Sequence, residues 1–248
     1  MQALSGKYIS FLGASTSTFD GFSNNRQYHS SLSNNAVYYP KDFLEDVVNT
    51  WWMRTVDALG LKLCVNNSWS GSCVTTTVDG ADKAGCMDRA TELHNDRLSI
   101  EPDIIILIIG GNDALRGYEI GPYNCVDDIY DSRTQAYIGN CTMFGQAYAT
   151  MVHKVTNRYR AADIYVCSML HWQPKKHDKD LAEYNEMIKK ISNEFQVTYV
   201  DFYNETDITP DTAHQYLHTD GVHPNKQGFE QMSNFVIKLL KSRYTEKE

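Results

Sequence analysis

The fold is decided by residues 103–113, which read DIIILIIGGND. The six aliphatic residues at 104–109 do not alternate with polar ones, and this is typical of a strand that is covered on both faces. A Gly-Gly-Asn-Asp turn then ends the run abruptly. We therefore expect a central strand of a parallel sheet at 103–109, with small and polar residues at its carboxyl end.

Shorter β-rich runs flank this strand and alternate with amphipathic stretches. The other strand candidates are residues 8–12, 61–66, 164–169 and 197–201. Helices are expected at 41–59, 83–98, 142–159, 178–195 and 225–243. This alternation indicates an α/β fold in which helices connect parallel strands.

Length and composition are those of an ordinary globular protein. A chain of 248 residues can bury one sizeable core, so we expect residues 1–248 to form a single domain. The formal net charge is 23 − 31 = −8, and the basic runs are short. Because nucleic-acid binding needs a basic surface, nucleic acid is not an expected partner.

Membrane insertion is not expected either, because the apolar run at 104–109 is far too short to cross a bilayer. Residues 1–7 lack the charged start and long apolar stretch of a signal peptide. The six cysteines form no C-x-x-C pair, and free thiols are common in reducing compartments. A cytoplasmic location is therefore favoured over a secreted protein given without its signal. The oligomeric state stays open.

Two long stretches fit no regular element. Residues 19–39 are rich in Ser, Asn and Tyr, and residues 116–141 are rich in Gly, Tyr and Asp. Both follow the carboxyl end of a predicted strand, where open α/β sheets bind ligands. Long loops inside a compact domain are usually functional or disordered. We expect both stretches to shape the site.

Small and hydrogen-bonding residues meet at that same edge from four segments. GAST at 13–16 follows the first strand, NSWSGS at 67–72 follows the second, and GGND at 110–113 follows the third. HTDGVHP at 218–224 directly precedes the last predicted helix. Glycine in such turns lets backbone N–H groups approach a substrate closely. This convergence is a stronger signal than any one of the motifs.

The residue types in these turns suit acyl transfer to a serine. Ser15 offers a hydroxyl at a turn, and His223 is the best base among eight histidines because Asp220 lies three residues earlier. The aspartate can accept the imidazole Nδ1–H and leave Nε2 free to take the serine proton. The backbone N–H groups of Ser15 and Gly71 and the side-chain amide of Asn112 would form the oxyanion hole.

Taken together, the four blocks resemble those of the SGNH (GDSL-like) serine hydrolases, in order and over residues 7 to about 240. The resemblance implies a flavodoxin-like, three-layer α/β/α fold with a five-stranded parallel sheet. It also implies ester hydrolysis without a metal or other cofactor. By matching motif positions, Ser15, Asp220 and His223 look like the triad, and Gly71 and Asn112 look like oxyanion donors.

One position departs from the family pattern. The first block usually reads Gly-Asp-Ser, and here Ala14 replaces the aspartate. The missing carboxylate would accept hydrogen bonds that hold the nucleophile turn. We therefore expect an enzyme that is active but slower or less stable than an Ala14→Asp variant.

Simpler interpretations exist for most of these residues. Alone, Ser15 would be an ordinary turn serine, and Asn112 could merely cap the segment that follows. Trp69 and Trp172 are candidates for the pocket lining, although either could be a core residue. His214 and His218 are spaced i, i+4, but no helix-borne Glu base accompanies them, so a metal site is not expected.

The sequence therefore predicts a serine esterase that acts through an acyl-enzyme on a small-molecule or carbohydrate ester. A short-chain acyl ester or a carbohydrate acetyl ester is the preferred substrate, since tyrosines suit stacking on sugar rings and no membrane-binding stretch is evident. A lysophospholipase or thioesterase of the same family is the alternative enzyme. A non-catalytic binding module of the same fold is the alternative from another class, and Ala14 favours it.

Overall fold

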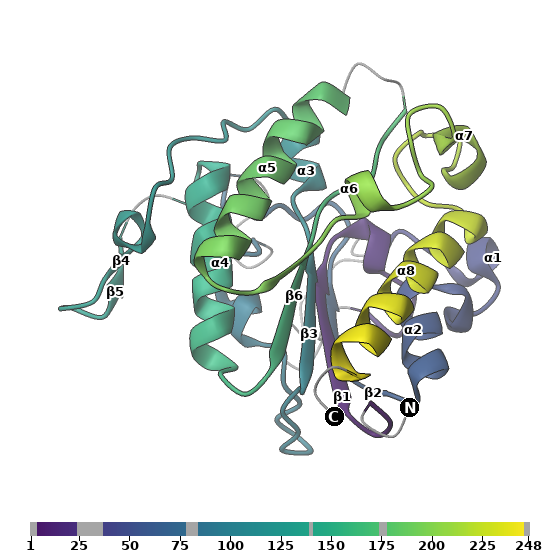
Figure 1. The fold of residues 1–248 in the computed structure, drawn as a ribbon, viewed down its shortest axis with the longest axis horizontal. Coiled ribbons are helices and arrows are strands. Elements are labelled where there is room, and N and C mark those ends of the chain that lie inside the picture. The colour runs from purple at the N-terminus through teal and green to yellow at the C-terminus, as the bar shows by residue number, and fades with distance from the viewer. Residues whose placement is uncertain (1–3, 24–36, 78–83, 139–140, 174–177, 246–248) are drawn as a thin grey trace.

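The computed structural model describes residues 4–23, 37–77, 84–138, 141–173 and 178–245. Its centre is a five-stranded, all-parallel sheet with the strand order β2-β1-β3-β6-β7 (Figure 1). The strands are Tyr8–Gly13 (β1), Lys62–Ser68 (β2), Ile104–Ile108 (β3), Asp163–Cys167 (β6) and Thr198–Val200 (β7). The five predicted strands and the parallel sheet are confirmed.

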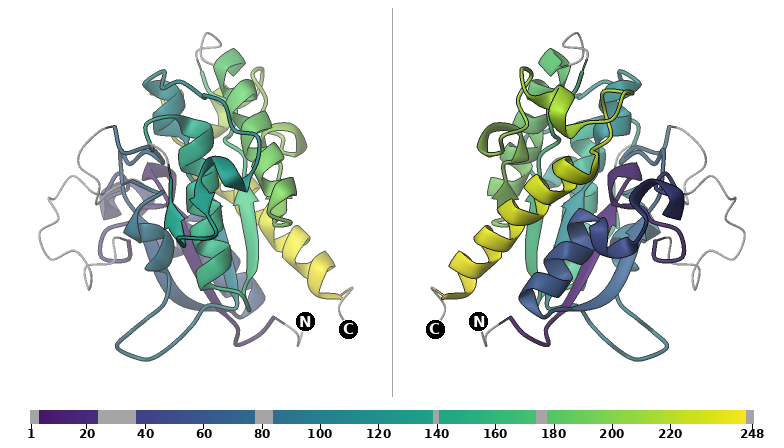
Figure 2. Two further views of the ribbon diagram at one scale, coloured as in Figure 1. Left: turned by 90° about the vertical axis from the view of Figure 1, so that its left-hand side faces the viewer. Right: turned by 90° about the vertical axis from the view of Figure 1, so that its right-hand side faces the viewer.

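Helices cover both faces of this sheet and complete the three layers (Figures 1 and 2). One face carries α4 (Phe144–Arg158) and α5 (Asp178–Glu194), and the other carries α2 (Trp51–Leu59) and α8 (Lys226–Thr245). The short helices are α1 (Lys41–Leu44), α3 (Gly111–Leu115), α6 (Phe202–Glu205) and α7 (Ala213–Tyr216). The 3-10 turns are η1 (Ser15–Ser17), η3 (Val47–Asn49), η5 (Asp88–Thr91) and η6 (Val126–Asp128).

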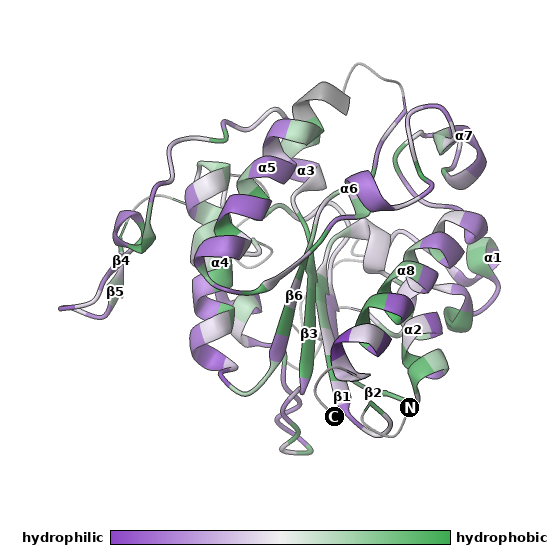
Figure 3. Cartoon of the chain, in the orientation of Figure 1, coloured by the Kyte–Doolittle hydropathy of each residue, from purple (hydrophilic) through white to green (hydrophobic). Residues whose placement is uncertain are grey.

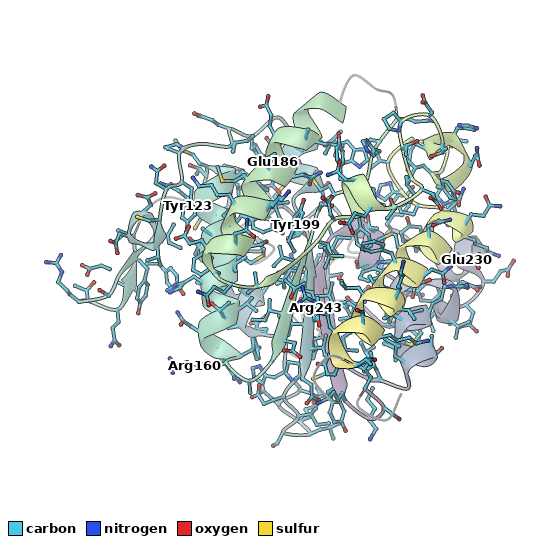
Figure 4. The ribbon with its side chains drawn as sticks, in the orientation of Figure 1. Tyr123, Arg160, Glu186, Tyr199, Glu230 and Arg243 are labelled. Atoms are coloured by element: carbon cyan, nitrogen blue, oxygen red, sulfur yellow. The ribbon has the colours of Figure 1, made fainter. Side chains whose placement is uncertain are left out.

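The central strand β3 divides the core into two hydrophobic clusters. Ile105 and Leu107 pack with α4 and α5, whereas Ile104 and Ile106 pack with α2 and α8. All four side chains are at most 1% exposed, and each contributes about 1.5–3 kcal/mol relative to an exposed position. Figure 3 shows the hydrophobic colour along β3. Charged side chains such as Glu186 on α5 and Glu230 on α8 are exposed (Figure 4).

Two of the predicted helices differ in the structure. The helix expected at 41–59 is broken into α1, η3 and α2, because Glu45 adopts a φ of +65° and Thr50 caps a new helix at Met53 N. The prediction of a helix at 83–98 is wrong, because the described residues 84–98 form only the single 3-10 turn η5 as helical structure. There the N–H groups of Gly85 and Cys86 donate to Cys73 and Val74 instead of to a preceding helical turn. Residue 83 lies outside the described residues.

The described part of 116–141 forms a small hairpin of β4 (Tyr130–Asp131) and β5 (Ala136–Tyr137), on the left of Figure 1. Its tyrosines pack against His153 of α4, with ring centroids 4.6 and 5.6 Å away. None of residues 116–138 lines the cavity described below, although Arg116 donates a hydrogen bond to Gly71 O in the loop after β2. The expectation that this stretch shapes the site stays a prediction. Residues 139–140, and residues 24–36 of the other stretch, lie outside the described residues.

The sheet order places a topological switch point between β1 and β3. The chain leaves β1 towards β2 on one side and returns to β3 on the other, so the loops after β1 and β3 diverge and leave a crevice. Ser15 follows β1 and Asn112 follows β3. The six cysteines have free thiols, and no helix in the described part of the chain is both long and apolar enough to span a bilayer.

Candidate active site

The candidate nucleophile begins the 3-10 turn η1 directly after β1. Ser15 is 8% exposed, and its backbone follows a sharp turn at Gly13 and Ala14. A Cβ atom at Gly13 would lie 2.9 Å from Ser68 Oγ and 3.0 Å from Ser17 Oγ. A larger residue at this position, where β1 and β2 end side by side, would therefore displace these serine side chains.

Backbone and buried side chains hold this turn. Ser17 N donates to Ala14 O at 3.0 Å, and both N and Oγ1 of Thr18 donate to Ser15 O. Beneath the turn, Nη2 of the fully buried Arg89 donates to Gly13 O at 2.8 Å and to Asn67 O at 2.5 Å. The turn thus has several anchors that do not need a carboxylate at position 14, whose alanine packs in the hydrophobic core.

The candidate base lies in a tight turn before α8. Gly221 has a φ of +74°, and a Cβ there would lie 2.1 Å from Gln173 O, so the turn requires glycine. Asp220 Oδ1 accepts the backbone N–H groups of Val222 and His223 at 2.9 and 3.0 Å. Asn225 Oδ1 then caps α8 by accepting Gly228 N. These contacts fix the position of His223 relative to the sheet edge.

The structure brings Ser15, Asp220 and His223 into one chain of hydrogen bonds. His223 Nδ1 lies 2.8 Å from Asp220 Oδ2, and its Nε2 lies 2.7 Å from Ser15 Oγ. A carboxylate only accepts hydrogen bonds, so the proton of the neutral ring belongs on Nδ1 and Nε2 is left to accept the serine proton. This is the arrangement that a serine nucleophile and its general base need.

The ionisation states suit the same chemistry. Burial acts to raise the pKa of Asp220, but hydrogen bonds from the His223 backbone, Tyr38, Val222 and the His223 ring hold it well below its usual range. Burial lowers the pKa of His223, although the hydrogen bond and charge of Asp220 oppose this shift. The carboxylate is therefore charged and the imidazole neutral at pH 7.

The loop after β2 and the turn after β3 meet beside the serine. Asn112 Nδ2 donates to Ser72 O at 2.9 Å and still has a second N–H. Gly71 has a φ of +76°, and its carbonyl accepts Arg116 Nη1. Asp113 is completely buried, and it accepts Val74 N, Thr75 N and Thr75 Oγ1 rather than purely local backbone.

A cavity of about 350 Å³ lies directly over Ser15. Ser15, Asn112, Asp220 and His223 line the cavity, whereas Gly71 does not. Its walls are mainly apolar and come from the nucleophile turn after β1, the ends of β3 and β6, α3 and the base turn. The apolar lining residues are Ala14, Ile108, Ile109, Leu115, Met169, Leu170, Trp172 and Val222.

Of the two tryptophans considered for the lining, only Trp172 borders this cavity. Trp69 is 1% exposed, because its Nε1 donates to Asn67 Oδ1 at 3.1 Å and its ring lies over the guanidinium of Arg89. It packs against Arg89 in the interior and is not among the residues that line this cavity. Among the described residues, no group of three or more His, Cys, Asp or Glu side chains could hold a metal ion.

Three residues of the site carry no obvious signal in the sequence. Arg89 lies in a segment that looks like an amphipathic helix, and Asp113 looks like part of a local turn. Tyr38 stacks on the His223 ring although it is 185 positions away, and it is one of several tyrosines in an irregular stretch. The pairing of Gly-Asn-Asp after β3 with a polar loop after β2 could have indicated the role of Asp113.

Comparisons with known proteins concern the family and the fold of the chain. A family model described as GDSL-like Lipase/Acylhydrolase matches residues 7–240. A multidomain esterase of Ruminococcus flavefaciens is 29% identical over 142 residues, which are 56% of this chain and 16% of that protein. The chain thus corresponds to a small part of that relative.

Solved structures show the same fold. A structure described as a GDSL-like lipase from Bacteroides ovatus is 25% identical and superposes with a TM-score of 0.70, over 96% of this chain and 99% of that one. Another so described, from Bacteroides uniformis, is 22% identical with a TM-score of 0.66, over 96% of each chain.

Proposed function

The chain belongs to the GDSL-like lipase/acylhydrolase family, and from that premise we propose that it is a serine esterase with Ser15 as nucleophile. The observation that carries the proposal is the unbroken path from Asp220 Oδ2 through His223 to Ser15 Oγ, with contacts of 2.8 and 2.7 Å. The family and the esterase relative support hydrolysis of ester bonds. The path supports a serine mechanism.

In the proposed first half-reaction, Ser15 Oγ attacks the carbonyl carbon of the ester, and its proton passes to His223 Nε2. The negative charge on the carbonyl oxygen is received by the N–H of Ser15 and the amide of Asn112, both of which border the cavity. The Gly71 N–H stays the third donor that the family pattern predicts. When the tetrahedral species collapses, the C–O bond to the alcohol breaks. His223 gives its proton to the leaving alkoxide, and the acyl group remains on Ser15.

The second half-reaction releases the acid. A water molecule loses a proton to His223 Nε2 and attacks the acyl carbon, and the bond to Ser15 Oγ then breaks as the serine regains that proton. The products are one alcohol and one carboxylic acid. No step requires a metal or an organic cofactor.

The cavity supports a small acyl group as the preferred substrate. Its volume of about 350 Å³ lies near the lower end of the range for ligand pockets, about 300–1,000 Å³. Its walls of aliphatic, Met and Trp side chains suit a short hydrocarbon chain rather than a charged or strongly polar group. We therefore propose esters of short acyl chains, with acetylated carbohydrates as one form of them.

A panel of substrates tests this proposal. We expect p-nitrophenyl acetate and butyrate to be hydrolysed with much higher kcat/KM than the palmitate ester, a palmitoyl lysophospholipid or a palmitoyl thioester. Met169→Ala enlarges the cavity wall and should shift the preference towards longer chains. Faster turnover of the long-chain substrates by the parent protein would contradict the short-chain assignment and favour a lysophospholipase or thioesterase.

The same panel includes acetylated sugars, which distinguish a carbohydrate acetyl esterase from a general short-chain esterase. Higher kcat/KM on an acetylated xylooligosaccharide than on p-nitrophenyl acetate would identify the former. Binding of such a sugar without any hydrolysis, and with no difference between the parent and Ser15→Ala, would instead indicate a binding module.

A further inference from the structure

Tyr38 covers one face of the candidate base. Its ring is stacked on the imidazole of His223, with centroids 3.6 Å apart and the two planes inclined by 12°. Its hydroxyl donates to Asp220 Oδ2 at 2.5 Å, which is the same oxygen that accepts His223 Nδ1–H. One side chain therefore contacts two of the three candidate catalytic residues.

The backbone around Tyr38 is tied to both turns of the site. Tyr38 N donates to Thr18 Oγ1 at 2.9 Å, and Thr18 Oγ1 donates to Ser15 O at 2.9 Å. The next residue, Tyr39, is fully buried and donates its hydroxyl to Pro224 O at 2.9 Å. Residues 38 and 39 thus connect the nucleophile turn after β1 with the base turn before α8.

We propose that Tyr38 is a positioning residue of this site: its ring keeps the His223 imidazole in line with Ser15, and its hydroxyl limits the negative charge that Asp220 presents to that imidazole. This inference rests on the proposed function, to which it adds a fourth residue beside the triad.

The stacking acts on geometry. A ring 3.6 Å away blocks rotation of the imidazole out of the plane that joins Asp220 and Ser15, and it keeps water from that face. When His223 takes the serine proton, the face of the Tyr38 ring also lies next to a cation, which aromatic rings attract. Loss of the ring should therefore lower turnover even if the fold is kept.

The hydroxyl acts on proton affinity. Asp220 Oδ2 accepts two hydrogen bonds, from Tyr38 and from His223, and Oδ1 accepts two more from backbone N–H groups. A donor removed from the carboxylate leaves more negative charge for the remaining partners. In Tyr38→Phe the His223 imidazolium is better stabilised, so the pKa of His223 rises.

The other titratable groups near the His223 ring do not mask this effect. Asp220 stays ionised because its pKa is held well below the usual range, and burial raises the pKa of Tyr38 and of Tyr39 far above neutrality. His218 lies in the same turn, and burial lowers its pKa as well. The two histidines must therefore be followed separately.

The experiment is an NMR titration of the His223 ring protons in the parent and in Tyr38→Phe, with the signals assigned from His223→Gln and His218→Gln. We expect the pKa of His223 to rise by about half to one pH unit in Tyr38→Phe, the scale of one hydrogen bond. The pH at which kcat/KM reaches half of its plateau should rise by the same amount. Tyr38→Ala should lower the plateau of kcat/KM on the order of 10²-fold, as a displaced catalytic group does.

Tyr137→Phe is the matched control, because Tyr137 lies on the hairpin β4–β5 and contacts another histidine, His153 of α4. It should leave the titration of His223 and the pH of half-maximal kcat/KM unchanged. An unchanged or lowered pKa of His223 in Tyr38→Phe, or parental activity in Tyr38→Ala, overturns the inference. If the parent hydrolyses no ester, the proposed function fails, and the NMR titration still decides what Tyr38 does to His223.

Discussion

The guanidinium of Arg89 donates a 2.8 Å hydrogen bond to the carbonyl of Gly13, two residues before the candidate nucleophile. The same Nη2 atom donates to Asn67 O at 2.5 Å, so a buried cation joins the ends of β1 and β2. Burial lowers the pKa of Arg89 to about 9. Burying a guanidinium costs desolvation free energy. We infer that Arg89 is kept there because it holds the ends of β1 and β2 in place.

Replacement of Arg89 should therefore destabilise the protein and weaken the site together. Arg89→Met leaves buried carbonyl oxygens without their charged donor, and we expect a loss of about 2–4 kcal/mol in the free energy of unfolding. The control is Arg158→Met, which removes an exposed pair with Glu101 and should cost less than about 1 kcal/mol. Urea denaturation measures both, and equal small losses would argue against an anchoring role for Arg89.

The buried carboxyl group of Asp113 should make the free energy of unfolding decrease as the pH rises. Burial raises its pKa from 3.8 to about 6, against hydrogen bonds from Val74 and Thr75. Because the folded state holds this proton more tightly, the favourable contribution is complete below pH 3.8 and is lost as pH rises through 6. Compared with Asp113→Asn, the parent should lose on the order of 2–3 kcal/mol between about pH 4 and 7. A stability difference that is the same at every pH would contradict this assignment.

The candidate base predicts the direction of the pH dependence of activity. His223 must be neutral to accept the Ser15 proton, and burial lowers its pKa from 6.5. We expect kcat/KM for p-nitrophenyl acetate to rise with pH and to level off, with its midpoint below pH 6.5. His223→Ala should lower kcat by several orders of magnitude, as in other triads. A flat profile between about pH 4 and 8 would exclude a titrating imidazole as the base.

Position 14 tests whether the nucleophile turn needs a carboxylate. The family pattern predicts that Ala14→Asp raises kcat/KM and adds about 0.5–1.5 kcal/mol of stability for each hydrogen bond that the carboxylate accepts. Burial of a charge among the apolar neighbours of Ala14 opposes this gain. Ala14→Asn, which has nearly the same shape without the charge, is the control. If neither property improves, the contacts from Thr18 and Arg89 already hold the turn.

The sheet was predictable because its signals are local. An uninterrupted aliphatic run such as 104–109 fits only a strand buried on both faces, and the polar turns directly after such strands had to share one edge. The prediction that Ser15, Asn112, Asp220 and His223 gather at one edge follows from this rule, and the cavity contains all four. Their catalytic roles stay predictions.

The parts that escaped prediction depend on tertiary contacts. The segment at 83–98 has helical spacing, but its backbone donors bond the loop after β2 and its arginine turns into the core. Nothing in the spacing of Tyr38 indicates a stack on a histidine 185 positions away. Likewise the sequence is compatible with Trp69 as either a pocket-lining or a core residue, and only the structure shows that it lies over Arg89.

The most direct test of the account is covalent labelling with a fluorophosphonate probe, followed by peptide mass spectrometry. The probe reacts much faster with a serine whose hydroxyl is activated by a base than with an ordinary serine. We predict a single adduct on Ser15, no adduct in Ser15→Ala, and much slower labelling in His223→Ala that still maps to Ser15. Failure to label the folded parent, or an adduct that persists in Ser15→Ala, would contradict the claim that Ser15 is the nucleophile.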